Sequence, residues 1–375
     1  MIISSLETAC YRIPLPRPLS DATHGRITHF QLVTVQLRDE NGIEGLGYTY
    51  TIGHGGIAIR SLVQVDLAPL LIGVNADDIE DIWQQMWQRL HYIGRGGLAS
   101  FAISAVDIAL WDLKGKALDQ PVCELMGGRQ RENIRAYASY LFGDEPDGTA
   151  ALAQEAVDLG LTAAKFGWNV FGQDPDVDVA HVQAARDVLG DQRDLMVDVG
   201  CKWTADVALE RAKLLQPLGI KWLEEPLSQD DLQGYKQLCA ESPVPIAGGE
   251  GDVTRFDFER LIDCGLSYLQ PDVAFCGGLT VCQQVSQMCA GTSTVCVPHC
   301  FSTGINLAAS LHWMASVGGD LVEYCLRPSP LMRKLVSNLP ALEEGRVPVP
   351  TGPGLGITLD EEILQQFRVD YDCAS

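Results

Sequence analysis

A repeated alternation of short apolar runs and longer amphipathic segments constrains the fold of this chain more than any other feature. From about residue 133 onward, eight runs read as strands, and the stretches between them carry apolar residues at helical spacing. The runs lie at 134–141, 163–167, 195–200, 221–226, 244–250, 268–273, 294–299 and 321–324. Strands that alternate with helices predict parallel strands joined by crossover helices, and eight such units fit a closed α/β barrel better than an open sheet.

The first part of the chain follows a different pattern. Residues 22–51 hold β-rich runs separated by Asp-Glu-Asn-Gly at 39–42, which predicts a hairpin. Residues 77–93 and 100–121 then carry apolar residues at helical spacing. We therefore expect three parts: an α+β capping domain with specificity loops at 1–127, the barrel with the catalytic site at 128–350, and a C-terminal segment that returns to the capping domain at 351–375.

Composition and charge exclude several classes of partner. The 375 residues are 46% hydrophobic and carry a net charge of −22, which argues against binding to nucleic acid or to anionic membrane surfaces. No signal peptide or apolar stretch of about 18 residues is seen, so we expect no membrane span. The 12 cysteines are scattered without a CxxC pair, which predicts reduced thiols and a cytoplasmic protein.

Three acidic residues mark the ends of three successive strand runs. Asp198, Glu224 and Glu250 are each separated by 26 residues, the length of one strand, one helix and two loops. The carboxyl ends of barrel strands converge on one mouth, where three carboxylates repel one another unless a cation lies between them. Oxygen ligands of this kind suit Mg²⁺, with Mn²⁺ as a substitute. The alternative is that each acid is a solvated loop residue or a helix N-cap.

Later strand ends add further chemistry. Asp272 and His299 close adjacent runs, and a carboxylate beside an imidazole orients it and raises its pKa, which favours a general base. Lys165 could act as base or acid, bind a substrate carboxylate, or pair with a metal-ligand carboxylate. Glu323 ends the last strand and could donate a hydrogen bond to substrate if protonated. Strand alternation turns Glu225 away from Glu224, where we expect it to hold a neighbouring lysine.

With these residues, the sequence resembles the mandelate racemase-like branch of the enolase superfamily. Residues 104–128 look like the helical signature of this branch, and residues 195–227 look like its metal-site signature. Residues 246–250, 270–280 and 297–312 are similar to its later strands, so the resemblance runs through most of the chain.

The resemblance implies a modified (β/α)₇β barrel with a capping domain and one Mg²⁺ held by Asp198, Glu224 and Glu250. It implies that the metal binds the carboxylate of a 2-hydroxy or sugar acid and that a base removes the α-proton to give a metal-stabilised enediolate. His299 with Asp272 matches the base of this family. Glu323 matches its hydrogen-bond donor to the substrate carboxylate. A homo-oligomer is implied as well.

One departure from the family pattern bears on the reaction. The branch often carries Lys-x-Lys on the second strand, with the second lysine as a base on the face opposite the histidine, but here the segment is Lys165, Phe166 and Gly167. Loss of one base favours dehydration of an aldonate or aldarate: α-proton abstraction, then loss of the 3-hydroxyl to yield a 2-keto-3-deoxy acid. A racemase or epimerase in which Lys165 or a group of the capping domain serves the second face, and a metal-binding barrel without catalysis, are the alternatives.

The family sets specificity largely through loops of the capping domain, which correspond here to residues 20–26 and 49–56. We expect polar side chains there to bind the small acid-sugar substrate, and their cations point weakly to a diacid. Turn capping is the alternative for each of them. The candidates for substrate binding are Thr23, His24, Arg26, His54, Arg95 and Lys202, the last of which is better explained as a loop cation.

Overall fold

A three-stranded antiparallel sheet opens the chain, and its order is β1-β2-β3. The computed structural model describes residues 1–21, 25–326 and 331–369. The strands are β1 (Ile3–Asp21), β2 (Gly25–Asp39) and β3 (Glu44–Thr51). The predicted hairpin is confirmed, because β2 pairs with β3 and the Asp39 carboxylate accepts backbone N–H bonds from Asn41 and Ile43 across the turn.

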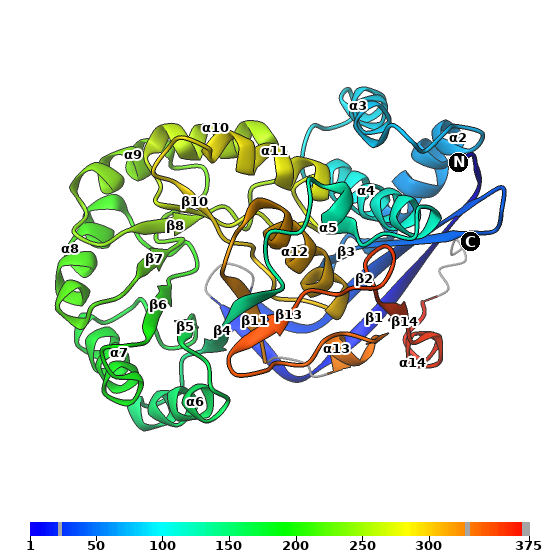
Figure 1. Cartoon of the computed structure of the whole chain (residues 1–375). Coiled ribbons are helices and arrows are strands. Elements are labelled where there is room, and N and C mark those ends of the chain that lie inside the picture. The colour runs from blue at the N-terminus through cyan, green and yellow to red at the C-terminus, as the bar shows by residue number, and fades with distance from the viewer. Residues whose placement is uncertain (22–24, 327–330, 370–375) are drawn as a thin grey trace.

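Helices of the front unit cover one face of this sheet (Figure 1). They are α1 (Gly56–Ser61), a π-helical turn (Leu62–Leu67), α2 (Ala68–Leu71), α3 (Ile79–Leu90), α4 (Leu98–Ala117) and α5 (Val122–Leu125). Helix α4 is buried on almost all sides. It lies close to β3 because the strand has Gly45 and Gly47 at the contact, where a Cβ on Gly47 would lie 1.9 Å from the Ala105 carbonyl oxygen.

The eight predicted runs form eight parallel strands in the order β10-β9-β8-β7-β6-β5-β4-β11. Their bounds are β4 (Asn133–Leu141), β5 (Ala163–Gly167), β6 (Asp194–Asp198), β7 (Trp222–Glu224), β8 (Ile246–Gly248), β9 (Tyr268–Leu269), β10 (Val295–Cys296) and β11 (Val322–Cys325). Seven helices join them: α6 (Pro146–Asp158), α7 (Pro175–Leu189), α8 (Ala205–Leu215), α9 (Leu232–Glu241), α10 (Arg255–Cys264), α11 (Leu279–Cys289) and α12 (Gly304–Val317). The fold is therefore a (β/α)₇β barrel with an α+β cap, as predicted.

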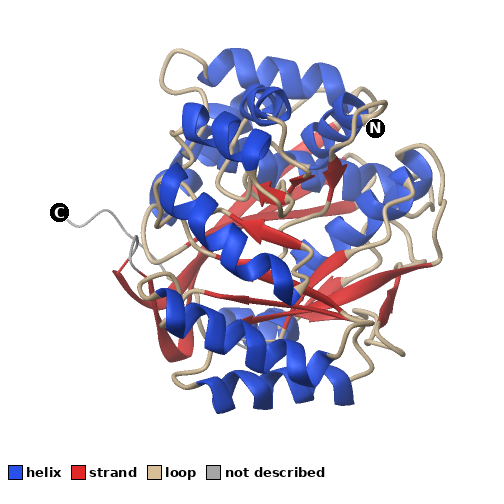
Figure 2. Ribbon diagram, turned by 90° about the vertical axis from the view of Figure 1, so that its left-hand side faces the viewer, coloured by secondary structure: helices blue, strands red, loops and turns tan. Residues whose placement is uncertain are grey.

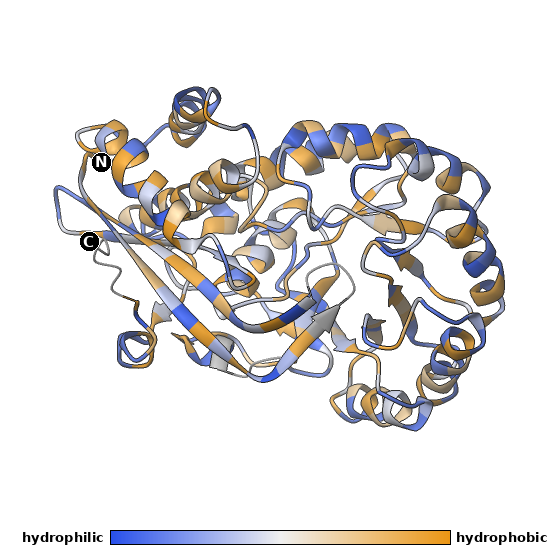
Figure 3. Ribbon diagram, turned by 180° about the vertical axis from the view of Figure 1, so that it is seen from behind, coloured by the Kyte–Doolittle hydropathy of each residue, from blue (hydrophilic) through white to orange (hydrophobic). Residues whose placement is uncertain are grey.

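The outer layer of helices and the inner layer of strands differ in hydropathy. Helices lie outside the curved strands (Figure 2), and most of them show one apolar and one polar side while the strands are mainly apolar (Figure 3). Inside the barrel, alternate strand residues form a separate buried cluster, which includes Tyr137, Met196, Trp222 and Val297. This cluster fills the barrel below the strand ends, so a site can form only at the mouth.

The C-terminal region runs back along both units. It contains α13 (Leu331–Lys334), β12 (Val336–Ser337), β13 (Arg346–Pro348), β14 (Thr358–Leu359) and α14 (Glu361–Gln365). Strand β13 pairs with β4, and the Arg12 N–H donates to the Phe367 carbonyl at 2.8 Å, which joins the tail to β1. The predicted domain boundaries themselves stay a prediction. Among the described residues, no helix is long and apolar enough to span a bilayer. The eleven described cysteines are free thiols, and the compartment stays a prediction.

One buried carboxylate joins the cap to the barrel and gives a prediction on stability. Asp107 of α4 accepts hydrogen bonds from the Thr280 N–H (3.0 Å) and hydroxyl (2.5 Å) at the start of α11. Burial nevertheless raises the pKa of Asp107 to about 7. Because the folded-state pKa lies above the unfolded value, the stabilising contribution of Asp107 is complete at low pH and is lost as the pH rises towards 7.

We therefore expect Asp107→Asn, which cannot ionise, to increase the free energy of unfolding at pH 8 relative to wild type by roughly 1–3 kcal/mol. At pH 4.5 the variant should gain nothing. Urea denaturation at both pH values measures the difference. The exposed Asp119, just after the end of the same helix, provides the control, because any effect of Asp119→Asn should be equal at the two pH values. An Asp107→Asn gain of equal size at both pH values would contradict the ionisation argument.

Candidate active site

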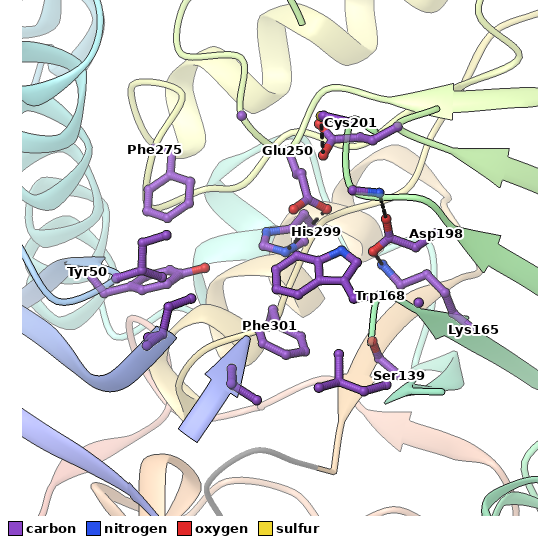
Figure 4. A pocket seen from close by; sticks show the side chains of 18 of the residues that line it. Tyr50, Ser139, Lys165, Trp168, Asp198, Cys201, Glu250, Phe275, His299 and Phe301 are labelled. Atoms are coloured by element: carbon purple, nitrogen blue, oxygen red, sulfur yellow. Dashed lines mark hydrogen bonds and ion pairs between the residues drawn. The ribbon is translucent and has the colours of Figure 1, made fainter. Parts of the chain in front are cut away.

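The three predicted metal ligands meet at the mouth of the barrel. Asp198 ends β6 and lies in register with Glu224 at the end of β7, and Glu250 follows β8. One carboxylate oxygen from each residue lies within 4.8 Å of the other two. Figure 4 shows Asp198 and Glu250 directed into the same pocket. The triad is thus brought together as predicted, because successive parallel strands end at the same level at this edge of the barrel.

The electrostatics of the triad fit a divalent cation. Burial, followed by the neighbouring Glu224, raises the pKa of Asp198 well above its usual range. Burial also raises the pKa of Glu250 to about 8, although His299 acts in the opposite direction. Three close, buried carboxylates are costly to ionise by themselves. Hard oxygen donors at this separation are the ligands that Mg²⁺ binds, so the residues present fit the ion that the fold implies.

Lys165 forms ion pairs both with the triad and with Glu323 of the last strand, β11. Its Nζ forms an ion pair with Glu224, lies 3.1 Å from Glu323 and lies 3.9 Å from Asp198. Burial lowers the pKa of Lys165, but the carboxylates around it, led by Glu224, raise it well above its usual value. Of the roles considered for Lys165, pairing with a metal-ligand carboxylate is the one that the contacts show. The other oxygen of Glu224 accepts from Trp222 Nε1 (2.8 Å) and Gln270 Nε2 (2.7 Å), which fixes its orientation.

His299 and Asp272 form the predicted dyad. The His299 Nδ1 lies 2.8 Å from Asp272 Oδ2, while Nε2 faces the triad at 3.6 Å from Glu250. Burial lowers the pKa of His299, but Glu250 and the hydrogen bond to Asp272 act in the opposite direction and raise it to about 10. A divalent cation on Glu250 would offset part of that negative charge, so the imidazole would release its proton at a lower pH.

Glu323 lies on β11 between Lys165 and the dyad. Its Oε2 accepts the Cys300 N–H at 2.8 Å and lies 4.0 Å from His299 Nε2. Although burial raises it, the Lys165 ammonium and His299 lower the pKa of Glu323 to about 2. Glu323 is therefore an acceptor in this arrangement, and its role as a protonated donor to substrate stays a prediction.

The expectation for Glu225 was wrong. Glu225 does not hold a lysine; its carboxylate accepts from Gln229 Nε2 (3.2 Å) and from the Cys201 thiol (3.5 Å), and it lines the pocket. Burial, then the charge of Asp198, raises the pKa of Glu225 to about 7. The physical reason is local: Glu225 has a φ of 40°, so the chain leaves the strand there before Pro226 and alternation no longer applies.

A cavity of about 470 Å³ lies above these groups, between the barrel and the cap. Lys165, Asp198, Glu250 and His299 form its floor. The remaining walls are mainly apolar, and their apolar and aromatic members are Leu19, Ile27, Phe30, Tyr50, Ile52, Phe101, Tyr140, Leu141, Trp168, Phe275 and Phe301. Figure 4 shows Tyr50, Phe275, Trp168 and Phe301 around His299. Smaller polar lining residues are Thr51, Ser139, Cys201, Ser228 and Gln229.

Four of the predicted substrate-binding residues are described by the structure, and none of these four lines the cavity. Thr23 and His24 lie outside the described residues. Arg26 and His54 are exposed, and neither is among the residues that line this cavity. Arg95 lines a separate surface groove. Lys202 Nζ donates to the Phe171 carbonyl at 2.8 Å, as expected of a loop cation. Substrate contacts through these residues therefore stay predictions.

Thr51 and Ile52 of the predicted loop 49–56 line the cavity, and Leu19 and Ile27 flank the predicted loop 20–26 and line it as well; the role of these loops in specificity stays a prediction. The sequence analysis did not predict the aromatic residues that line the cavity, which we call the aromatic wall. Trp168 follows the second strand directly, so its place at a strand end was a usable signal. Phe30, Phe101 and Phe275 could not be told from ordinary core residues. Lys165 is the one lysine or arginine among the described lining residues.

Gly167, which stands where the family pattern often has a second lysine, lies directly against a residue of the predicted metal site. A Cβ at this position would lie 2.9 Å from Asp198 Cβ and 3.0 Å from Asp198 Oδ2, so Asp198 would have to move. We expect Gly167→Ala to weaken Mg²⁺ binding by roughly 10-fold, as measured by calorimetry. Gly148→Ala is the control, since a Cβ there meets its nearest atom at 3.5 Å. Equal Mg²⁺ affinity in Gly167→Ala and wild type would show that this close approach is unimportant.

Comparison with known proteins defines the class. The N-terminal domain of the mandelate racemase / muconate lactonizing enzyme family matches residues 5–127, and the enolase C-terminal domain-like family matches residues 148–363. The chain therefore belongs to the enolase superfamily, in its mandelate racemase-like branch, and this confirms the resemblance seen in the sequence.

Two similar proteins and one similar crystal structure show which members of the superfamily this chain resembles. The chain is 39% identical to 3,6-anhydro-alpha-L-galactonate cycloisomerase from Streptomyces coelicolor over 98% of this chain and 100% of that protein. It is 31% identical to D-galactonate dehydratase from Verminephrobacter eiseniae over 90% of this chain and 91% of the relative. A crystal structure of a racemase from Streptomyces coelicolor with bound magnesium superposes with a TM-score of 0.89 at 38% identity, covering 98% of this chain and 100% of that one. The acidic triad and this neighbour support Mg²⁺ as the cofactor.

Proposed function

We propose that this chain catalyses a magnesium-dependent β-elimination on a sugar monocarboxylate, in which the α-proton is removed and the bond between C3 and its oxygen breaks. The preferred substrate is an anhydro sugar acid, whose ring opens. The single observation that carries the proposal is that a base is present on one face of the site. His299 Nδ1 lies 2.8 Å from Asp272 Oδ2 and the imidazole faces the cavity, while position 167, where the family often has a second base, is a glycine. A one-sided base is suited to starting an elimination, whereas racemisation needs a base on each face.

Each residue of the site has its own role in the elimination. His299 Nε2 takes the proton from C2, and Asp272 stabilises the imidazolium that forms. The C3–O bond then breaks, and the protonated His299 or Lys165 returns a proton to the departing oxygen. The product enol rearranges to a 2-keto-3-deoxy acid. Mg²⁺, when held by Asp198, Glu224 and Glu250, supplies positive charge that offsets the charge developing on the substrate carboxylate.

The same elimination gives two outcomes that depend on the substrate. In an anhydro sugar acid the oxygen at C3 belongs to a ring ether, so it stays attached through its other carbon and the product is an isomer of the substrate. In a linear aldonate the oxygen at C3 is a hydroxyl, so it leaves as water. The cycloisomerase and dehydratase names of the relatives correspond to these two outcomes.

The cavity walls favour the anhydro acid. A linear aldonate would place several hydroxyls against Phe30, Leu141, Trp168 and Phe301, and each buried hydroxyl without a partner costs roughly 1–3 kcal/mol. An anhydro acid ties two of its oxygens into an ether and presents a less polar face. Lys165, the one lysine or arginine among the described lining residues, already pairs with Glu224 and Glu323, which favours a monoacid over an aldarate.

Dehydration of a linear aldonate is the second candidate. Ser228 and Gln229 line the barrel side of the cavity near Glu225 and offer partners for hydroxyls. This is the reaction to which the sequence pointed, and it needs the same base and the same metal ligands.

A substrate panel separates these outcomes. Purified, Mg²⁺-loaded protein is incubated with 3,6-anhydro-aldonates, linear aldonates, aldarates and simple 2-hydroxy acids, and 2-keto products are detected with semicarbazide. Mass spectrometry then distinguishes an isomer of the substrate from a product lighter by one water. Deuterium incorporated from D₂O with inversion and without a 2-keto product would establish a racemase instead. No product from any class, with Mg²⁺ binding shown by calorimetry, would overturn the proposal and favour a barrel without catalysis.

A further inference from the structure

The carboxylate of Asp272 has more partners than its bond to His299 requires. Its Oδ1 accepts the Ala274 N–H at 2.7 Å. The Asn306 Nδ2 lies 3.1 Å from Oδ1 and 3.2 Å from Oδ2, and the Tyr50 hydroxyl donates to Oδ2 at 3.4 Å. Asp272 is fully buried, so these donors and His299 use the accepting capacity of both oxygens.

Asn306 is itself held in one orientation. It lies in the first turn of α12, is fully buried, and accepts a hydrogen bond at Oδ1 from the Ser310 hydroxyl at 3.1 Å. With its oxygen occupied, the amide presents its NH₂ group to Asp272. The Thr303 hydroxyl caps the same helix by accepting from the Ile305 and Asn306 N–H groups, which fixes the start of α12 beside the dyad.

Tyr50 brings the capping domain into contact with the dyad. It lies on β3, and its ring packs against Phe275 at 4.6 Å between centroids and edge-on against Phe30 at 5.8 Å. Its hydroxyl points into the pocket towards His299 in Figure 4. The ring is therefore fixed by packing from both domains, and the hydroxyl has a defined position above Asp272.

We propose that Asn306 and Tyr50 are positioning residues for the general base. Together they prevent rotation of the Asp272 carboxylate, so that Oδ2 keeps the Nδ1–H of His299 and the lone pair of Nε2 faces the substrate. Asn306 belongs to the barrel and Tyr50 to the cap. The cap therefore helps to orient the imidazole of His299 and also forms part of the cavity wall. This inference rests on the proposed function, because it assigns His299 as the base.

The kinetic test uses variants that remove one donor and keep the volume. Asn306→Leu has no donor, and Tyr50→Phe loses only the hydroxyl. In the full-length, Mg²⁺-loaded protein we expect Asn306→Leu to lower kcat roughly 10- to 100-fold and Tyr50→Phe roughly 3- to 10-fold, with KM changed less than threefold. Tyr235→Phe is the matched control: its buried hydroxyl donates to the Leu227 carbonyl at 3.1 Å, and its removal should leave kcat within twofold.

A second measurement needs no substrate. In protein labelled with ¹⁵N-histidine and loaded with Mg²⁺, the His299 ring is assigned by its loss in His299→Asn. At a pH at which the His299 ring of the Mg²⁺-loaded protein is neutral, we expect the Nδ1–H tautomer in wild type and a mixture of tautomers in Asn306→Leu. Failure of the substrate panel alone would reject the proposed reaction and leave this result standing.

Two outcomes would overturn the inference. One is kcat within twofold of wild type in both Asn306→Leu and Tyr50→Phe together with an unchanged tautomer. The other is an equal loss of kcat in Tyr50→Phe and Tyr235→Phe, which would show a general effect of removing a buried hydroxyl. If Asn306→Leu does not fold, the comparison of the two tyrosine variants decides the question.

Discussion

Replacing His299 with asparagine is expected to lower kcat by roughly 10³-fold or more on any substrate that the wild type converts to a 2-keto acid, with Mg²⁺ binding retained. The proton α to a carboxylate is very weakly acidic, and His299 Nε2 is the group that the dyad aims into the cavity. Asparagine keeps a polar side chain beside Asp272 but has no basic nitrogen. Steady-state kinetics and exchange of the α-proton in D₂O should fall together, because both depend on the same proton transfer.

The control for this variant is His91→Asn, at an exposed position at the end of α3 where Nδ1 lies 2.8 Å from the Gln88 carbonyl. It should leave both rates unchanged. If α-proton exchange survives in His299→Asn while product formation is lost, a different group removes the proton and His299 acts later, on the departing oxygen. That result would transfer the role of base to Lys165.

Much of the fold could be predicted because it depends on local patterns. Each of the eight apolar runs contains a strand, and most strands of the barrel are short and buried, which gives a clear contrast with the amphipathic helices. The metal triad was predictable for a related reason. In parallel strands, equal spacing along the chain becomes equal height in the barrel, so the 26-residue interval places Asp198, Glu224 and Glu250 side by side.

The errors arise where the local pattern ends. Glu225 was assigned by strand alternation, but β7 stops at Glu224, and a positive φ turns the next side chain back towards the mouth. Arg26, at the start of β2, is exposed, whereas the next residue, Ile27, is buried and lines the cavity. Substrate binding by Arg26 stays a prediction.

The aromatic wall could not be predicted, because it exists only where the cap meets the barrel. Phe30 and Phe101 come from the cap and Phe275 from the loop after β9, and the rings of Phe101 and Phe275 stack at 4.5 Å between centroids. In the sequence each is one apolar residue among many. The substrate class therefore depends on long-range packing, whereas the metal and the base depend on strand ends. This explains why polar side chains of the capping loops were expected at the substrate and a mainly apolar cavity was found.

Magnesium is expected to raise the thermal unfolding midpoint of the wild-type chain, and Asp198→Asn to abolish that increase while raising the midpoint of the metal-free protein. Burial and Glu224 raise the pKa of Asp198 well above its usual range, so ionised Asp198 opposes folding when no cation is present. Asparagine removes the charge and can still accept the Gly200 N–H, which lies 2.9 Å from Oδ1. At 100 times its dissociation constant, Mg²⁺ stabilises the wild type by about 2.7 kcal/mol, or roughly 3–6 °C.

The pH dependence and a control make this prediction specific to the triad. A folded-state pKa above the unfolded value means that the metal-free wild type loses stability as the pH rises, so the increase caused by Mg²⁺ should be larger at pH 8 than at pH 6. Asp194, at the start of β6, is the opposite case: despite its burial, Lys221 at 3.0 Å and Arg135 at 2.9 Å lower its pKa. Asp194→Asn should therefore lower the midpoint and keep the response to Mg²⁺. If Asp198→Asn behaved like Asp194→Asn, the three carboxylates would not be acting as one cation site.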